Sequence, residues 1–345
     1  MANAASAEPA SNSLPEVLVT FPGYELDGTK NGAALRAAGF APRLEPRLGE
    51  RTPAELSRLL GDAVAAIVST DPFDAQVLAA APHLRVIARL GVGVDSIDLE
   101  AATRHGVVVT VTPGANEPTV ADHAVALMLA ALRRVCELDR GIRRGEWNRT
   151  GPHTPWLLTG ATVGLVGYGR IGRLVAQRLR GFDVRLLACD LRAPEEVDVE
   201  HVELAELLAT SDVVSLHTPL APGTRGLIGR DALAAMRPEA VLVNTARGGV
   251  VDEEALAEAL ASGRLRAAAL DVFAEEPPLN SPLRELPNVV LSPHNAGLSV
   301  QSLAEMSVRA TASALDVLAG RVQPDLANPQ VLDSDAFRER VMAGA

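Results

Sequence analysis

The chain has 345 residues, of which 48% are hydrophobic and 22% are charged, and its formal net charge is −11. This length is too great for one ordinary core, so two domains are expected, and the negative charge excludes nucleic-acid phosphates as a partner. The longest uncharged apolar run, 124–132, is too short to cross a bilayer, so no membrane association is expected. Cys136 and Cys189 lie far apart and show no metal-ligand spacing, which predicts no metal and a reducing cytoplasm.

Taken in chain order, residues 1–13 are small and polar, lack the features of a signal peptide, and predict a disordered tail. Strands and helices then alternate. Thr52, Pro53 and Glu55 form a capping box with proline at the first helical position. Strands are expected at 16–21, 65–70, 84–89 and 107–111, and helices at 33–38, 75–81 and 99–105. Short apolar strands joined by helices indicate a parallel sheet that is buried on both faces.

One long helix is expected next, from about Thr119 to Arg144, because apolar residues recur on one face at helical spacing. Its length favours a spine that links domains or subunits, and packing against the core is the simpler alternative. A loop rich in Gly, Pro and Thr follows at 145–160.

A second alternating set contains six expected strands, the number found in a dinucleotide-binding sheet. They are 161–167, 183–190, 213–218, 240–246, 266–272 and 289–293. The last helix, 299–318, is expected to return to the first domain. The predicted class is therefore α/β, with two Rossmann-like, doubly wound parallel-sheet domains. The first comprises 14–112 and 299–345, and the second, the cofactor domain, comprises 113–298.

The cofactor motif is Gly167-x-Gly169-x-x-Gly172, which follows a strand and opens a helix. Its glycines permit a tight turn, close approach to a pyrophosphate, and helix–strand packing, respectively. The backbone N–H groups of Arg170 and Ile171 are expected to face the phosphates. Asp190 ends the next strand, where it can bind both ribose hydroxyls and repel a 2′-phosphate, so NAD is preferred over NADP. Arg192, close by, is able to soften that preference if it turns inward.

Polar residues gather at three later strand ends, the edge at which open α/β sheets bind ligands. They are Arg247, whose approach Gly248 and Gly249 are expected to keep clear, Asp271 with Glu275 and Glu276 beyond it, and His294. Asp252 is expected to cap the following helix. Hydride chemistry on a hydroxy acid needs a cation for the carboxylate, a histidine for the hydroxyl proton, and a carboxylate that orients the histidine.

Alternatives remain at this level. His217 also ends a strand and is a rival proton carrier, Glu275 competes with Glu276, and Arg247 can simply pair with Asp252. The remaining histidines lie in expected helix-terminal or loop contexts and are interpreted as structural: His83, His105, His123, His153 and His201.

With these residues in view, the chain resembles the D-isomer-specific 2-hydroxyacid dehydrogenase family, from about Ala65 to Pro329. It is most similar to the branch of D-3-phosphoglycerate dehydrogenase and hydroxypyruvate/glyoxylate reductase. The segments that carry the resemblance are GVGVDSIDLEAA, TPGANEPTVADHA, VGYGRIG, SLHTPLAPGTRGLI, NTARGGVVDEEAL, ALDVFAEEP and SPHNAG.

The resemblance implies roles for individual residues. Arg247 matches the substrate-binding arginine, His294 the acid–base histidine, and Glu276 its partner, because the family's glutamate directly precedes the proline. Asp271 matches a nicotinamide contact. The other implied cofactor residues are Thr245 and Ala246, by their backbones, and His217 and Thr218, in the nucleotide pocket. The other implied substrate residues are Arg89, the amides of Val92 and Gly93, and Asn116.

The resemblance further implies an active site in the cleft between the domains, closure over the substrate, and a homodimer through the cofactor domains. One departure concerns phosphate: a second arginine of some phosphoglycerate enzymes is replaced by Ser69, with Asp71 close by, which argues against a phosphorylated substrate. No regulatory domain is expected after the last helix.

The leading hypothesis is an NAD-dependent enzyme that interconverts a small D-2-hydroxy acid and its 2-keto acid, with a phosphoglycerate-, hydroxypyruvate- or glyoxylate-like substrate. The alternative is an NAD(H)-sensing regulatory protein of the same fold, similar to the corepressor branch of the family. Oxidation of another small anion, such as formate or phosphite, is disfavoured by the His294 context and the GVGVD loop.

Overall fold

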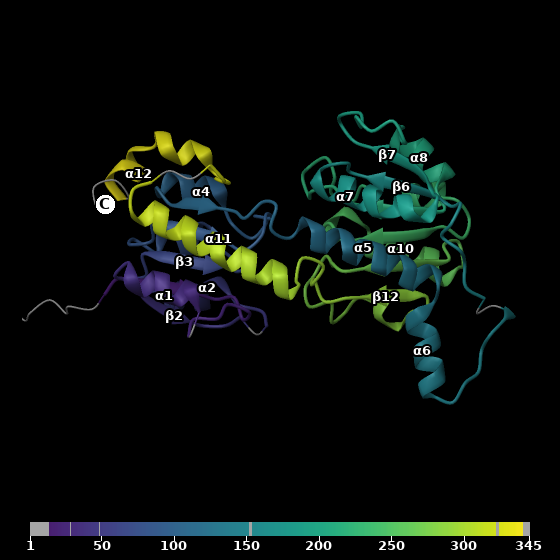
Figure 1. The fold of residues 1–345 in the computed structure, drawn as a ribbon, viewed down its shortest axis with the longest axis horizontal. Coiled ribbons are helices and arrows are strands. Elements are labelled where there is room, and N and C mark those ends of the chain that lie inside the picture. The colour runs from purple at the N-terminus through teal and green to yellow at the C-terminus, as the bar shows by residue number, and fades with distance from the viewer. Residues whose placement is uncertain (1–13, 28, 48, 152–153, 322–323, 341–345) are drawn as a thin grey trace, which may run out of the picture. The chain divides into compact units, whose positions relative to one another are not determined.

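The computed structural model describes residues 14–27, 29–47, 49–151, 154–321 and 324–340. These fold as two compact units (Figure 1). The first unit contains the described residues up to Pro113 and from Leu303 onward, and the second is Gly114–Ser302. The tail expected at 1–13 lies outside the described residues.

The first unit is a parallel sheet of five strands in the order β2-β1-β3-β4-β5. Its strands are β1 (Glu16–Val19), β2 (Ala41–Leu44), β3 (Ala65–Val68), β4 (Val86–Arg89) and β5 (Val108–Thr110). Its helices are α1 (Lys30–Ala37), α2 (Pro53–Leu60), α3 (Ala75–Ala79), α4 (Leu99–Arg104), α12 (Asp335–Arg340) and most of α11 (Val300–Leu318). The capping box of α2 is confirmed, because the Thr52 side chain accepts from the Glu55 N–H and the Glu55 carboxylate accepts from the Thr52 N–H.

Strand β2 was not expected from the sequence. It contains Pro42, which cannot donate a ladder hydrogen bond, and it lies at the edge of the sheet, where proline is tolerated. Its residues are all partly exposed, so it lacks the continuous apolar run of a central strand.

The second unit is a parallel sheet of seven strands in the order β12-β11-β10-β9-β6-β7-β8. The strands are β6 (Thr162–Val166), β7 (Arg185–Cys189), β8 (Val199–His201), β9 (Val213–Leu216), β10 (Val241–Asn244), β11 (Ala267–Leu270) and β12 (Val289–Leu291). The helices are α5 (Glu117–Leu132), α6 (Val135–Arg143), α7 (Arg170–Leu179), α8 (Leu204–Thr210), α9 (Arg230–Ala235) and α10 (Glu253–Ala261). Six strands were expected, and β8 is the addition: a short edge strand with two exposed residues.

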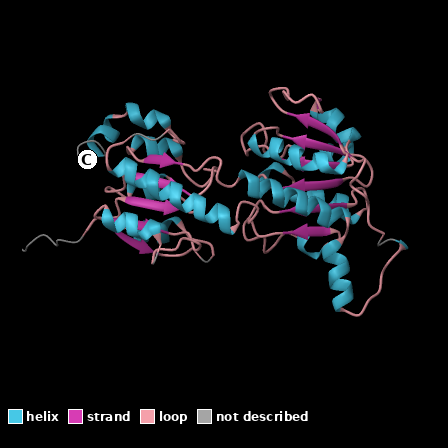
Figure 2. Ribbon diagram, in the orientation of Figure 1, coloured by secondary structure: helices cyan, strands magenta, loops and turns pink. Residues whose placement is uncertain are grey.

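Helices cover both faces of this sheet (Figure 2). One buried cluster joins the sheet to α8, α9 and α10, and the other joins it to α5 and α7. The chain runs from β6 outward to β8 and then returns to β9 on the other side of β6. The carboxyl ends of β6 and β9 therefore flank a topological switch point, the position at which sheets of this class bind ligands.

The prediction of a single helix over 119–144 is wrong, because the structure has two helices there, α5 and α6. The chain breaks between α5 and α6 at Arg134, whose φ of 53° lies in the left-handed region. Its backbone N–H bonds to the Ala131 carbonyl oxygen, as in a helix terminus. The apolar stripe also ends here, because Val135 is 54% exposed. Among the described helices, none has the length and apolar character that a membrane crossing requires.

Candidate active site

The turn after β6 has the geometry that the glycine motif predicts. Gly167 has φ of 93°, and a Cβ there would lie 2.7 Å from the carbonyl group of His217. A Cβ on Gly172 would lie 2.4 Å from the Gly167 oxygen, so α7 packs against the turn only with glycine at this position. A Cβ on Gly169 would meet nothing within 4 Å. This glycine leaves space at the start of α7 for a ligand.

Helix α7 begins at Arg170, and Gly169 is its N-cap. The N–H groups of its first turn, among them those of Arg170 and Ile171, have no acceptor within the helix and create an anion site. Asp190 follows β7 and is tied to the same turn, because its carboxylate accepts from the Tyr168 N–H at 2.6 Å and from the Arg192 N–H at 3.3 Å.

Two buried polar atoms at neighbouring strand ends indicate that a dinucleotide fits here. His217 Nδ1 and Thr245 Oγ1 have no hydrogen-bond partner in the described part of the chain. Thr218 follows His217, and its backbone nitrogen would lie 2.8 Å from a Gly167 Cβ. Ala246 is held by a hydrogen bond from its N–H to Asn244 Oδ1. Together with the space beside Gly169, these polar groups fit a bound NAD molecule.

His217 is less suited to proton transfer than its position at a strand end implies. Burial lowers its pKa to about 4, so the imidazole is neutral near pH 7. Its Nε2 lies 3.0 Å from Ser215 Oγ. The rival role of this histidine therefore has little support.

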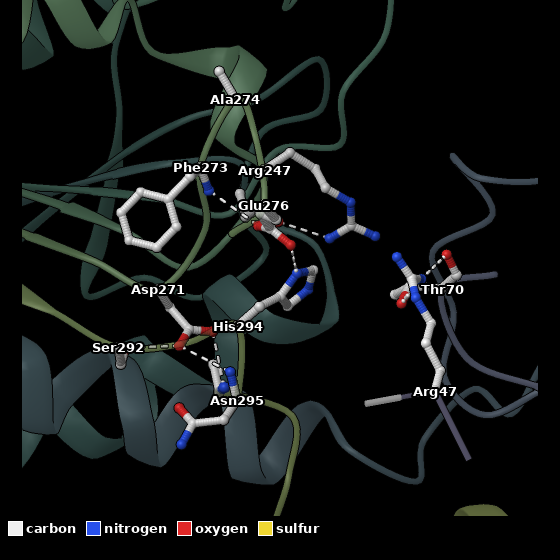
Figure 3. A network of polar contacts seen from close by, with 12 residues as sticks. Arg47, Thr70, Arg247, Asp271, Phe273, Ala274, Glu276, Ser292, His294 and Asn295 are labelled. Carbon is white, nitrogen blue, oxygen red and sulfur yellow. Dashed lines mark hydrogen bonds and ion pairs between the residues drawn. The ribbon is translucent and has the colours of Figure 1, made fainter. Parts of the chain in front are cut away.

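His294 and Glu276 form the central pair of the site (Figure 3). His294 follows β12, and its Nδ1 lies 2.6 Å from Glu276 Oε2. The other oxygen, Glu276 Oε1, accepts from the Phe273 N–H at 3.0 Å. Each of the two side chains is 35% exposed. The glutamate is thereby fixed at one oxygen and orients the imidazole with the other, which leaves His294 Nε2 for a reacting group.

Arg247 follows β10, and Figure 3 shows its guanidinium beside Glu276 and His294. Its Nη1 donates to the Ala246 carbonyl oxygen at 2.6 Å. Gly248 was expected to keep the approach to Arg247 clear, but the structure gives it a role in backbone packing. A Cβ at this position would lie 1.8 Å from the Phe273 carbonyl carbon. The missing side chain lets the strand end pack against the loop that carries Glu276. The expected Asp252 cap is confirmed, since its side chain accepts from the Ala255 N–H.

Asp271, fully buried at the end of β11, organises the His294 loop. Its carboxylate accepts from Ser292 Oγ at 2.6 Å, from the Asn295 N–H at 3.0 Å and from the Ala296 N–H at 2.8 Å. Burial would raise the pKa of Asp271, but the His123 imidazole, whose Nε2 lies 3.5 Å away, and hydrogen bonds from Ser292 and these two amides outweigh it and lower that pKa. Sequence reasoning missed this set of contacts.

Asn116 precedes α5 and has a buried Oδ1 without a partner among the described residues. The other residues that the sequence predicts as substrate contacts, Arg89, Val92 and Gly93, belong to the first unit, where they follow or end β4. Gly91, with φ of 118°, turns the chain there, and its N–H bonds to Thr112 Oγ1 at 2.7 Å.

At the end of β3, in the same unit, the buried Asp71 carboxylate accepts from Arg51 Nη1 at 2.7 Å and from Thr20 Oγ1 at 2.6 Å. The charge of Arg51 is therefore balanced within the protein.

Comparison with known proteins agrees with this geometry. Residues 125–296 match the model of the D-isomer specific 2-hydroxyacid dehydrogenase, NAD binding domain. A glyoxylate reductase of Korarchaeum cryptofilum is 45% identical over 272 residues, which cover 76% of this chain and 82% of that protein. A D-3-phosphoglycerate dehydrogenase of Mycobacterium leprae is 44% identical over 277 residues, covering 79% of this chain but only 52% of that protein.

Among solved structures, the TT0316 protein of Thermus thermophilus has a TM-score of 0.83 and 41% identity, and the match covers 90% of this chain and 99% of that one. The sequence matches and the fold agree on one assignment. The chain belongs to the D-isomer specific 2-hydroxyacid dehydrogenase family, and it is an NAD-dependent oxidoreductase.

Proposed function

We propose that the enzyme interconverts a small D-2-hydroxy acid and its 2-keto acid, with His294 as the acid–base residue. The observation that carries this proposal is the 2.6 Å contact between His294 Nδ1 and Glu276 Oε2. A histidine held in this way has a fixed ring orientation, and the carboxylate stabilises the imidazolium that forms when Nε2 takes a proton.

Each residue then has one task. His294 Nε2 accepts the hydroxyl proton during oxidation and returns it to the carbonyl oxygen during reduction. Arg247 binds the substrate carboxylate with its planar pair of donors. NAD supplies the hydride chemistry, and the residues that would hold it include Gly169 and the first turn of α7. Asp190 would bind its ribose, and Thr245, Ala246, His217, Thr218 and Asp271 would surround the rest.

The amides of Val92 and Gly93, with Arg89 and Asn116, complete the substrate contacts in this proposal. The preferred substrate is short and unphosphorylated, in the class of glyoxylate and hydroxypyruvate. Support comes from the end of β3, where Asp71 balances the charge of Arg51. A phosphate dianion needs uncompensated cations, and this pair offers no net charge.

We also propose a cytoplasmic homodimer assembled through the second unit. Apolar side chains on α6 and the segment after it are exposed: Ile142 is 55% exposed and Trp147 is 76% exposed. Such residues mark interaction surfaces when they are grouped. Cys136 and Cys189 are both free thiols, which suits a reducing compartment.

The proposal is tested by a substrate screen. NADH and NADPH are each combined with glyoxylate, hydroxypyruvate, phosphohydroxypyruvate and bulkier 2-keto acids, and absorbance at the nicotinamide band is followed. The proposal predicts NADH oxidation with a short unphosphorylated keto acid. Absence of turnover with every keto acid would contradict it and would favour the regulatory alternative.

A further inference from the structure

A histidine that the mechanism does not use lies behind the active site. His123 is in the middle of α5, a helix that packs on β10 and β11. Its Nε2 lies 2.9 Å from Ser292 Oγ and 3.5 Å from the carboxylate of Asp271. The side chain is 25% exposed, whereas that of Asp271 is 1% exposed. The imidazole therefore reaches from α5 to the base of the loop that carries His294.

The direction of the hydrogen bonds in this network can be assigned. Asp271 is ionised near pH 7, since its pKa is lowered, and a carboxylate only accepts. Ser292 has one hydroxyl proton and donates it to Asp271 Oδ1 at 2.6 Å. Its oxygen must then accept at the contact with His123. His123 consequently carries a proton on Nε2, and the order of donation is His123 to Ser292 to Asp271.

The same carboxylate holds the active-site loop in place. Asp271 accepts from the N–H groups of Asn295 and Ala296, and its backbone oxygen accepts from the His294 N–H at 2.7 Å. His294 has φ of 50°, in the left-handed region that a residue other than glycine rarely adopts. A backbone in that region persists only where its surroundings hold it, and here Asp271 accepts hydrogen bonds from His294 itself and from the two residues that follow it.

We propose that His123 is a positioning residue for the proton-transfer step. It orients Ser292 and Asp271, these fix the loop 292–296, and the loop presents the His294 imidazole to Glu276. His123 touches neither substrate nor cofactor in this proposal, which rests on the proposed role of His294. The network is contained within the second unit, so it requires no contribution from the first.

The test compares His123→Leu, which removes the donor, with His123→Gln, whose side-chain amide is able to restore it. Loss of one hydrogen bond to the network predicts a kcat about tenfold lower for His123→Leu, with KM and NADH affinity within about twofold. The kinetic isotope effect from NADH deuterated at C4 should rise, because hydride transfer becomes slower than product release. His123→Gln should recover most of kcat.

Asp122→Asn is the matched control, since Asp122 is the neighbouring residue on α5 and forms an exposed ion pair with Arg178. It should leave kcat unchanged. Ser292→Ala deletes the middle of the network and gives the same test if His123→Leu does not fold. Because the two side chains act in series, His123→Leu combined with Ser292→Ala should lose no more kcat than the worse single variant.

The inference would be overturned if folded His123→Leu kept the kcat and the isotope effect of the parent. It would also be overturned if the losses of kcat in the two single variants multiplied in the double variant, or if Asp122→Asn lost as much kcat as His123→Leu. These outcomes are distinct from failure of the proposed function, in which the unaltered enzyme itself reduces no 2-keto acid.

Discussion

Replacing Glu276 by glutamine tests the contact on which the proposed chemistry depends. Glutamine has nearly the same shape, and its side-chain oxygen is able to keep the bond from the Phe273 N–H. The amide nitrogen then faces His294 Nδ1 and can only donate to it. His294 must carry its single proton on Nε2 in this variant, where it cannot accept the hydroxyl proton of the substrate.

The magnitude follows from the 2.6 Å separation and the exposure of the pair. A hydrogen bond that involves a charged group contributes about 1.5–3 kcal/mol, and tenfold in rate corresponds to about 1.4 kcal/mol. Both side chains are 35% exposed, so solvent screening places the effect toward the lower end. We expect kcat/KM for hydroxy-acid oxidation to fall by about 10- to 50-fold.

The assay is steady-state oxidation of the hydroxy acid identified by the screen, with NADH affinity measured by fluorescence. Glu275→Gln is the matched control, because it removes the adjacent exposed carboxylate and leaves the pair intact. Equal losses in the two variants, or a Glu276→Gln enzyme as active as the parent, would refute the reasoning.

Three further predictions address other groups. Arg247→Lys should raise the KM of the keto acid by at least about tenfold with little change in NADH affinity, because an ammonium group cannot form the paired contact; an unchanged KM would argue against carboxylate binding. Asp190→Ser should raise the NADPH-to-NADH ratio of kcat/KM by about tenfold or more, since it removes a charge that repels the 2′-phosphate. The third concerns His217, whose folded pKa of about 4 lies below the ordinary value of 6.5. As the pH falls, His217 takes up a proton in the unfolded chain before it does so in the folded protein. The free energy of unfolding is therefore highest above pH 6.5, and His217 lowers it by at most about 3 kcal/mol as the pH falls toward 4. Urea unfolding of the parent and of His217→Gln at several pH values measures this, and a difference that stays constant with pH would contradict it.

Much of the second unit could be predicted because its signals are local. Buried strands are short apolar runs, and the three glycines of the cofactor motif stand within six consecutive residues between a strand and a helix. The elements that escaped prediction have weak or contrary signals. Strand β2 contains Pro42, and β8 has only three residues, two of them exposed. The break at Arg134 depends on a left-handed backbone that neither glycine nor proline marks.

In the candidate site, too, residues with local sequence signals could be predicted, and residues whose contacts are distant along the chain could not. Arg247, Glu276 and His294 were predicted from strand ends and from family resemblance. The role of Gly248 was not, because its packing partner, the Phe273 backbone, is 25 residues further along the chain. The sequence predicts a structural role for His123 in a helix-terminal or loop context, but this histidine lies within α5 and contacts Ser292, 169 residues away. Contacts of that separation leave no trace in local sequence patterns.

The central claim is that His294 transfers the proton that accompanies hydride transfer. A single-turnover experiment tests it most directly: enzyme saturated with NADH is mixed with the keto acid, and NADH absorbance is followed for the parent and for His294→Ala. We expect hydride transfer to slow by about 10²- to 10⁴-fold in the variant, with NADH affinity nearly unchanged. A rate within a few-fold of the parent in the folded variant would contradict the claim.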